Sequence, residues 1–329
     1  MARVLVVGHI CLDLIPNMPA NSEIEPGKLL EVGDMQMSTG GAVSNVGLVL
    51  DRLGTEVELV AKIGNDFLGQ AIRERVGKLS TGLIADQSVG TSYTIVLSQP
   101  GVDRSFLHYP GANTTLCSAD ISDAALSRAA LMHFGYPPLL PRFFQNNGAD
   151  LVDLFRRAKA LNVLTSLDMS LPDPNSASGA VDWKTLLAEV LPFCDFFLPS
   201  IDELRAIFGL QQTADELAER LLDLGAKIVM IKQGADGFLV RSRAAFAHGP
   251  NLSAFIPCFE VEVVGTTGTG DATIAGFISG FIDGLSPHET FNRAAAAGAC
   301  ACESADSTSG IPNMEALNLR IGKWCDKVC

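Results

Sequence analysis

Residues 264–272 read Val-Gly-Thr-Thr-Gly-Thr-Gly-Asp-Ala, and the apolar stretch TIAGFISGFI follows at 273–282. This order is typical of a strand that runs into a glycine-rich turn and then opens a helix. Glycine lets the backbone approach a ligand closely, and the first N–H groups of a helix are unpaired donors at the positive end of its dipole. The turn at Gly268, Thr269 and Gly270 therefore predicts a site for an anion, above all one whose charge develops during a reaction.

Asp271 stands at the mouth of this expected helix. A carboxylate there can take the proton from an attacking hydroxyl, and phosphoryl transfer requires little beyond positioning, charge stabilisation and such a base. The structural alternative is that Asp271 only caps the helix and that the glycines only make the turn. For a glycine-rich turn in isolation, the structural alternative is preferred.

Short apolar runs alternate with amphipathic segments along the chain. The expected buried strands are 3–10, 57–64, 131–135, 163–168, 195–199 and 227–232. The expected helices are 44–53, 66–78, 142–160 and 213–224. This alternation predicts an α/β fold with a mostly parallel sheet, flanked by helices on both faces, that binds ligands near the carboxyl ends of its strands.

Two stretches break this rhythm. Residues 29–38 and 91–109 alternate apolar and polar side chains, as half-exposed strands do. They predict a small sheet set apart from the main one, inserted at about 11–39 and 91–112. The chain from Asp271 onward is strongly helical in character, and there is no internal repeat or disordered linker. We therefore expect one domain over residues 1–329 with a strand insert.

The composition limits the classes of partner. The 329 residues are 47% apolar and carry 37 acidic against 24 basic side chains, a net charge of −13. Because duplex binding requires clustered Lys and Arg, nucleic acid is excluded as a partner. An anionic ligand would have to be held by helix N-termini, glycine-loop amides and a metal ion.

The lack of a signal peptide, of a membrane span and of CxxC pairs in the sequence predicts a cytoplasmic protein. His9 and Asp13 interrupt the apolar N-terminal stretch, so it is interpreted as a first strand and not as a signal peptide. No segment reaches the roughly 20 apolar residues that a membrane span needs. None of the eight cysteines forms a CxxC pair, which favours reduced thiols in a cytoplasmic protein with no membrane partner.

The ordered motifs resemble those of the ribokinase (PfkB) family of carbohydrate kinases. GTTGTGD at 265–271 resembles the second signature of that family, usually written DTTGAGD, and GGAVSN at 40–45 resembles the first. KIGND at 62–66 is a further landmark between them. The match runs from Asp13 to about Pro312 in the right order. It implies a ribokinase-like fold and the transfer of the γ-phosphoryl of ATP to a sugar hydroxyl, with Asp271 as base and the backbone of Gly268–Gly270 as anion hole.

The resemblance also assigns substrate residues. It implies that Asp13 and Asn45 hydrogen-bond sugar hydroxyls, and that Gly40 and Gly41 let the sugar lie against the backbone. The structural alternatives are a turn residue for Asp13 and a helix cap for Asn45. The small sheet resembles the family's lid, which covers the sugar and often mediates dimerisation, so a homodimer through the lid is an expected partner. Arg104 and Asn113 lie on or just after this lid, and an exposed strand arginine is the alternative for Arg104.

For the nucleotide, the resemblance implies ATP with Mg²⁺. The implied ATP-binding positions are Ser200, Lys232, Gly234, Gly237 and Thr266. Glu203, in a segment that resembles the PNxxE motif, is expected to organise Mg²⁺ through water, since Mg²⁺ keeps several waters. The alternatives are a solvated lysine for Lys232 and an ordinary first-turn charge for Glu203.

The sequence departs from the family pattern at five places. Gly265 stands where the second signature has Asp, which leaves activation by a monovalent cation such as K⁺ open. Thr269 stands where the same signature has Ala or Gly. Ser200 replaces the Asn of PNxxE. Residues 168–172 lack the Asn and Arg of the DxNxR pattern, and Ala295 replaces an Asn found near adenine.

Two other functions stay open beside the sugar kinase. A nucleoside kinase of the same fold needs apolar or aromatic residues around a base, and the 17 Phe allow this. A catalytically silent sugar-binding regulatory protein would account for Ser200 and Gly265, although Asp271 is retained. A Rossmann dehydrogenase is excluded, because residues 7–10 lack the GxGxxG spacing.

Overall fold

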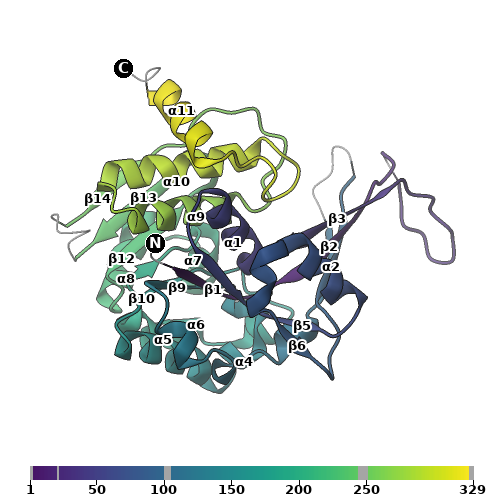
Figure 1. Ribbon diagram of the computed structural model, residues 1–329, viewed down its shortest axis with the longest axis horizontal. Helices are drawn as coiled ribbons and strands as arrows, with labels where there is room; N and C mark the ends of the chain where they lie inside the picture. The colour runs from purple at the N-terminus through teal and green to yellow at the C-terminus, as the bar shows by residue number, and fades with distance from the viewer. Residues whose placement is uncertain (1–2, 21, 100–104, 244–250, 326–329) are drawn as a thin grey trace.

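The computed structural model describes residues 3–20, 22–99, 105–243 and 251–325, and its centre is a large sheet with helices on both faces (Figure 1). Among the described residues, eight strands form this sheet in the order β14-β13-β12-β11-β10-β9-β1-β4. The strands from β12 to β4 pair in parallel, and β13 and β14 are antiparallel at one edge. Their bounds are β1 Val4–Gly8, β4 Val57–Val60, β9 Leu131–Gly135, β10 Leu164–Leu167, β11 Phe196–Phe197, β12 Ile228–Lys232, β13 Phe238–Ser242 and β14 Ser253–Ile256. The predicted mostly parallel sheet is confirmed, and β13 and β14 have no counterpart among the expected strands.

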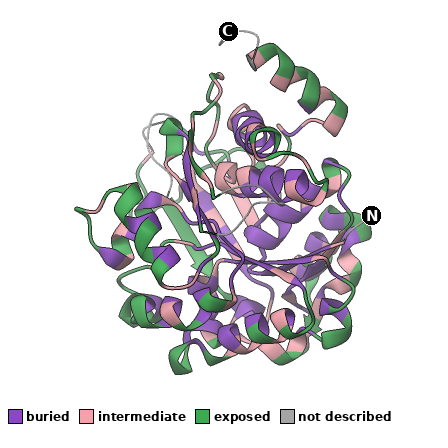
Figure 2. Cartoon of the chain, turned by 90° about the vertical axis from the view of Figure 1, so that its left-hand side faces the viewer, coloured by how far each residue is buried: buried purple, intermediate pink, exposed green. Residues whose placement is uncertain are grey.

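Helices cover both faces because the central strands are apolar on both sides. Val4 and Val6 of β1 pack in the core beneath α1, α9 and α10, whereas Leu5 and Val7 pack in the core beneath α5, α6 and α8. Figure 2 shows the buried residues, in purple, gathered toward the inside of the molecule, and exposed residues, in green, on its outside. The helices are α1 Ala42–Arg52, α2 Phe67–Val76, α3 Asp123–Leu126, α4 Pro141–Phe144, α5 Ala149–Ala160, α6 Trp183–Val190, α7 Ile201–Phe208, α8 Ala214–Asp223, α9 Thr269–Ile282, α10 Pro287–Cys302 and α11 Met314–Cys325. The helical character expected after Asp271 is confirmed by the last three helices.

A second sheet projects from this body, to the right in Figure 1. Its strands lie in the order β3-β2-β7-β8. They are β2 Cys11–Pro16, β3 Met35–Gly40, β7 Tyr93–Leu97 and β8 Ser105–Tyr109. The separate small sheet is thus confirmed. The strand expected over 29–38 begins only at Met35, because residues such as Leu29 (91% exposed) have no neighbouring strand to pack against.

Two expected elements are divided in the structure. The helix expected over 142–160 is wrong as one element: α4 ends at Phe144, and α5 begins at Ala149. Asn146, Asn147 and Gly148 between them all have positive φ, which a continuous right-handed helix does not allow. The strand expected over 57–64 is likewise two strands. After β4 the chain forms β5 Lys62–Gly64, which pairs with β6 Ile84–Asp86 outside the main sheet.

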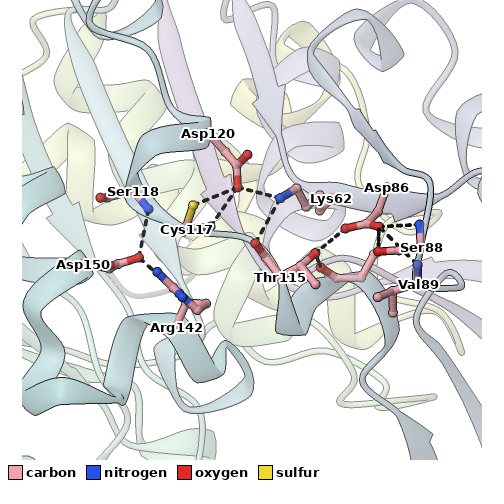
Figure 3. Close-up of polar contacts among 11 residues, drawn as sticks. Lys62, Asp86, Ser88, Val89, Thr115, Cys117, Ser118, Asp120, Arg142 and Asp150 are labelled. Atoms are coloured by element: carbon pink, nitrogen blue, oxygen red, sulfur yellow. Dashed lines mark hydrogen bonds and ion pairs between the residues drawn. The ribbon is translucent and has the colours of Figure 1, made fainter.

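A polar network anchors the base of the small sheet (Figure 3). Lys62 of β5 donates hydrogen bonds to the Thr115 carbonyl oxygen (3.0 Å) and to Asp120 Oδ2 (2.8 Å). Thr115 in turn donates to Asp86 Oδ2 of β6 (2.6 Å). These contacts join the β5–β6 pair to the segment that follows β8, so the end of the small sheet is fixed to the body.

Among the described residues, no helix combines the length and the apolar character that a bilayer crossing requires. Cys11, Cys117, Cys194, Cys258, Cys300 and Cys302 are free thiols, and Cys11, Cys194 and Cys300 are buried.

Candidate active site

A cavity of about 310 Å³ lies between the small sheet and the N-terminus of α9. Alternate residues of the small sheet face it, as the two-residue repeat of a strand dictates. These are Cys11, Asp13 and Ile15 of β2, Gln36 and Ser38 of β3, Thr94 and Val96 of β7 and Phe106 of β8. Asn45, Tyr136 and Asp271 line the opposite side. The small sheet therefore forms one wall of the cavity, and the helix mouth forms another.

The carboxylate of Asp271 is held by one of its oxygens. Oδ2 accepts hydrogen bonds from Asn45 Nδ2 (2.8 Å) and from the Tyr136 hydroxyl (2.7 Å). Oδ1 is buried and has no hydrogen-bond partner among the described residues. Burial raises the pKa of Asp271, while the two donors and the charge of Lys232 act in the opposite direction. One oxygen is thus fixed and the other remains available to a hydroxyl in the cavity.

The N-terminus of α9 has the geometry of an anion site. Gly268 is the N-cap with φ +72°, and no side chain caps this end. The first i to i−4 hydrogen bond runs from Ala272 N to Gly268 O (2.8 Å), so the N–H groups of Thr269, Gly270 and Asp271 precede it and have no partner within the helix. A Cβ on Gly268 would collide with Ser307. Glycine is therefore required at the position where the turn approaches the cavity.

The diglycine at 40–41 makes room for two side chains of the cavity wall. A Cβ on Gly40 would collide with the Asp13 carboxylate, and a Cβ on Gly41, whose φ is +89°, would lie 2.5 Å from His9 Nδ1. Burial raises the pKa of Asp13 to about 6, and the hydrogen bond from Cys11 opposes that shift. Asp13, Gly40 and Gly41 are thus brought together at the cavity.

Asn45 and Asn113 occupy different surroundings. Asn45 lies at the cavity and bridges Asp271 to Ser307, whose hydroxyl donates to Asn45 Oδ1 (2.7 Å). Asn113 is fully buried and hydrogen-bonds both the N–H (3.3 Å) and the carbonyl (2.8 Å) of Ile10. It is not a lining residue, and it holds the chain where β1 leads into β2. Arg104 lies outside the described residues.

Lys232 lies beside the helix mouth on the side away from the small sheet. A Cβ on Gly270 would be 3.6 Å from Lys232 Nζ, which also forms an ion pair with Asp168 (2.8 Å). Burial alone would lower the pKa of Lys232, but the charges of Asp168 and Glu203 leave it raised. A lysine ammonium and the free amides of α9 therefore meet at one place.

Ser200 and Glu203 form a capping box at the start of α7. Ser200 N donates to Glu203 Oε2 (2.7 Å), and Glu203 N donates to Ser200 Oγ (3.3 Å). The backbones of Ser200 and Lys232 pair in an isolated parallel β-bridge, so the capping box lies next to that lysine. Burial raises the pKa of Asp168; Lys232 opposes this shift, and the carboxylates of Glu203 and Asp271 add to it. The cluster therefore carries more acidic groups than basic ones.

The remaining sequence-predicted positions lie on two turns. Gly234 and Gly237 form the turn from β12 to β13 with φ of +59° and +111°, and a Cβ on Gly237 would collide with Ile256 O. Nothing lies within 4 Å of a Cβ built on Gly234. Thr266 precedes α9, and its carbonyl accepts from Thr269 Oγ1 (3.1 Å).

Several lining residues of the cavity were not predicted from the sequence, among them Tyr136, Ser307 and His9. Tyr136 has a left-handed backbone (φ 63°), which is uncommon for a residue with a side chain. It follows β9 directly, so its place at the carboxyl end of a predicted strand was a usable signal. Ser307 lies in a loop with no motif. His9 was treated only as an interruption of an apolar run.

Known proteins resemble the whole chain. Residues 1–314 match the pfkB family carbohydrate kinase. A 2-dehydro-3-deoxygluconokinase of Bacillus subtilis is 28% identical over 302 residues, covering 89% of each chain, and a fructokinase-1 of Zea mays is 26% identical, covering 84% of this chain and 82% of that protein. A ribokinase-like protein of E. coli, solved in complex with ATP and Mg²⁺, superposes with a TM-score of 0.79 at 21% identity, covering 98% of this chain and 100% of that chain.

The fold and the family match agree with the motifs at 40–45 and 265–271. The chain belongs to the PfkB family of carbohydrate kinases, which are ATP-dependent phosphotransferases.

Proposed function

We propose that this protein transfers the γ-phosphoryl group of ATP to a hydroxyl of a sugar or sugar derivative, with Asp271 as general base. One observation carries the proposal: Asp271 Oδ2 is held by two donors, while Oδ1 is buried, unpaired and next to the unpaired amides of α9. In this reaction Oδ1 accepts the hydroxyl proton as the acceptor oxygen bonds to phosphorus and the bond to ADP breaks. The amides of Gly268–Gly270 stabilise the charge that develops.

Asp13, Gly40, Gly41 and Asn45 are proposed to bind the acceptor. Their support is that all four line the cavity that Asp271 faces. A carboxylate and an amide satisfy both the donors and the acceptors of a polyol. For Arg104, acceptor binding is proposed from the sequence alone. For Asn113 we propose an indirect role, because its side chain hydrogen-bonds the backbone of Ile10 and holds it in place.

The nucleotide is proposed to lie on the other side of Asp271. Lys232, Ser200 and Thr266 would face its phosphates, and Gly234 and Gly237 would pass beside it. Lys232 and the α9 amides fit an anion, and the excess of carboxylates over lysines among Asp168, Glu203, Asp271 and Lys232 fits a cation such as Mg²⁺, with Glu203 acting through water. When bound, ATP with Mg²⁺ supplies the phosphoryl group and neutralises part of its charge.

The residues present do not fit the family's usual monovalent-cation ligand. Gly265 supplies no carboxylate, and a Cβ there would lie 2.7 Å from Ser304 O. We therefore propose no cation ligand at residue 265.

The small sheet is proposed to act as a lid and as a dimer interface. On the cavity side it separates the acceptor from water, which prevents wasteful hydrolysis of ATP. On the outer side, cross-strand pairing aligns Met37, Leu14, Ile95 and Leu107 in one row. Met37 and Leu107 are 40% and 56% exposed, so this row is an apolar surface suited to a second copy of the chain.

The alternatives have weaker support. A nucleoside kinase would need aromatic residues around a base. The described lining positions hold three aromatic rings, those of His9, Phe106 and Tyr136, and Tyr136 already donates to Asp271. A silent binding protein would have no need of an oriented carboxylate with a free oxygen. The relatives' names include both an acidic and a neutral sugar, so the family alone does not identify the acceptor.

Asp271→Asn tests the base directly. With Mg-ATP and a panel of sugars, sugar acids and nucleosides, we expect the wild type to release ADP with one acceptor class and the variant to lose about 10²- to 10⁴-fold in kcat. The side chain of Asp215 is 66% exposed on α8, so Asp215→Asn is the matched control and is expected to retain activity. Acceptor-dependent turnover that survives in Asp271→Asn would rule out the assigned base.

Tyr136→Phe tests how the base is tuned. The variant loses a donor to Asp271 Oδ2, so the Asp271 pKa should rise further. Because the base must be ionised, activity falls as the pH drops through this pKa, and the acid limb of the kcat/KM profile should move to higher pH by about one unit. Tyr93→Phe, on the outer side of the small sheet, should leave the profile unchanged. A limb that stays in place or moves to lower pH contradicts the proposed tuning.

Leu107→Glu tests the dimer. Sedimentation equilibrium should give a dimer for the wild type and a monomer for the variant, because the charge would be buried in the interface. Leu210→Glu changes a residue that is 76% exposed after α7 and should leave the dimer intact. A monomeric wild type would refute the interface.

A further inference from the structure

The cavity beneath the small sheet is lined by acidic and neutral groups. Asp13, Asp271 and Asp306 are its acidic lining residues, and the lining positions that the structure describes include no lysine or arginine. Lys232, near the helix mouth, is already paired with Asp168. A carboxylate or phosphate on an acceptor would therefore lie beside like charges, with no cationic side chain among the described lining positions to balance it, which is unfavourable.

His9 adds a more specific requirement. It is 3% exposed, it lines the cavity, and within the part of the chain that the structure describes neither ring nitrogen has a hydrogen-bond partner. Its ring lies against Gly41 and 5.4 Å from the ring of His108. Burial and the neighbouring His108 lower the pKa of His9 to about 3. The ring is therefore neutral and presents one N–H donor and one acceptor.

The unpaired polar atoms of this cavity match a ligand that can both donate and accept hydrogen bonds. Besides the two nitrogens of His9, the buried oxygens Thr267 Oγ1 and Asp271 Oδ1 have no partner. A hydroxyl can donate to one such atom and accept from another, whereas an ionised carboxylate or phosphate can only accept. Leaving buried polar atoms unpaired is costly, so a polyol matches these walls better than an acid does.

We propose that the acceptor is a neutral polyol, with neither a carboxylate nor a phosphate, and that His9 hydrogen-bonds one of its hydroxyls beside Asp271. This inference rests on the proposed function and narrows its acceptor. Apolar side chains of the small sheet, Ile15, Val96 and Phe106, would contact the C–H faces of such a sugar.

The test compares acceptors that differ in charge. With saturating Mg-ATP, kcat/KM is measured for neutral hexoses and pentoses, for their terminal phosphates and for sugar acids including 2-dehydro-3-deoxygluconate. Binding of the same compounds to Asp271→Asn with a non-hydrolysable ATP analogue is measured by calorimetry. We expect a neutral sugar to exceed every anionic acceptor by about 100-fold in both measurements.

Two pairs of variants assign the cause. His9→Phe keeps a ring but loses both nitrogens, so KM for the neutral acceptor should rise about 10-fold with kcat little changed, and His9→Asn should recover part of the loss. His288→Phe, at an exposed position of α10, is the control. Ser98→Arg adds a cation to the cavity wall and should raise the use of anionic acceptors, whereas Ser98→Gln should not. Melting temperatures verify that each variant folds.

The outcomes separate the two proposals. Preference for an anionic acceptor overturns the inference but leaves the proposed kinase function intact. Loss of that preference in Arg104→Gln would then show that Arg104 binds the anionic group. Absence of turnover with every acceptor, together with tighter binding of a neutral sugar, supports the inference and refutes the proposed reaction. Failure of every neutral sugar to bind overturns the inference, as does a His9→Phe variant with unchanged KM.

Discussion

The two hydrogen bonds that Asn45 and Tyr136 donate to Asp271 Oδ2 set the geometry of the cavity. They come from α1 and from the residue after β9, so they connect the large sheet and α1 to α9. Because both donors bond to Oδ2, the lone pairs of Oδ1 remain available to another hydrogen-bond donor. Burial works against ionisation and the donors work for it, so the same contacts that orient the carboxylate also tune its pKa.

Close backbone packing allows these groups to meet. Gly40 and Gly41 leave space for Asp13 and His9, and Gly268 leaves space for Ser307 behind Asn45. Side chains at these positions would push the small sheet away from the helix mouth. The polar network around Lys62 and Asp86 fixes the other end of the small sheet. The cavity is therefore defined by contacts between segments far apart in sequence. The same contacts decide which polar atoms of its walls remain available to a ligand.

The sequence was sufficient for the fold because the central strands are buried on both faces and leave continuous apolar runs. The partly exposed edge strand β14 and the Asn-Asn-Gly break between α4 and α5 were missed because they give weak local signals, and the buried strand β13 next to β14 was missed as well. At the site, Asp13, Asn45 and Asp271 belong to motifs and could be named in advance. Tyr136 and Ser307 belong to no motif, and their roles depend on hydrogen bonds across 135 and 262 residues; the place of Tyr136 directly after a predicted strand was the one usable signal. His9 was overlooked since only burial without a partner makes it notable.

A crystal structure with a bound acceptor and a non-hydrolysable ATP analogue would test the central claim most directly. We expect an acceptor hydroxyl within hydrogen-bonding distance of Asp271 Oδ1, in line with the terminal phosphorus, and that phosphate at the amides of Thr269 and Gly270. An acceptor whose nearest hydroxyl lies at another carboxylate, with Oδ1 still unpaired, would contradict it.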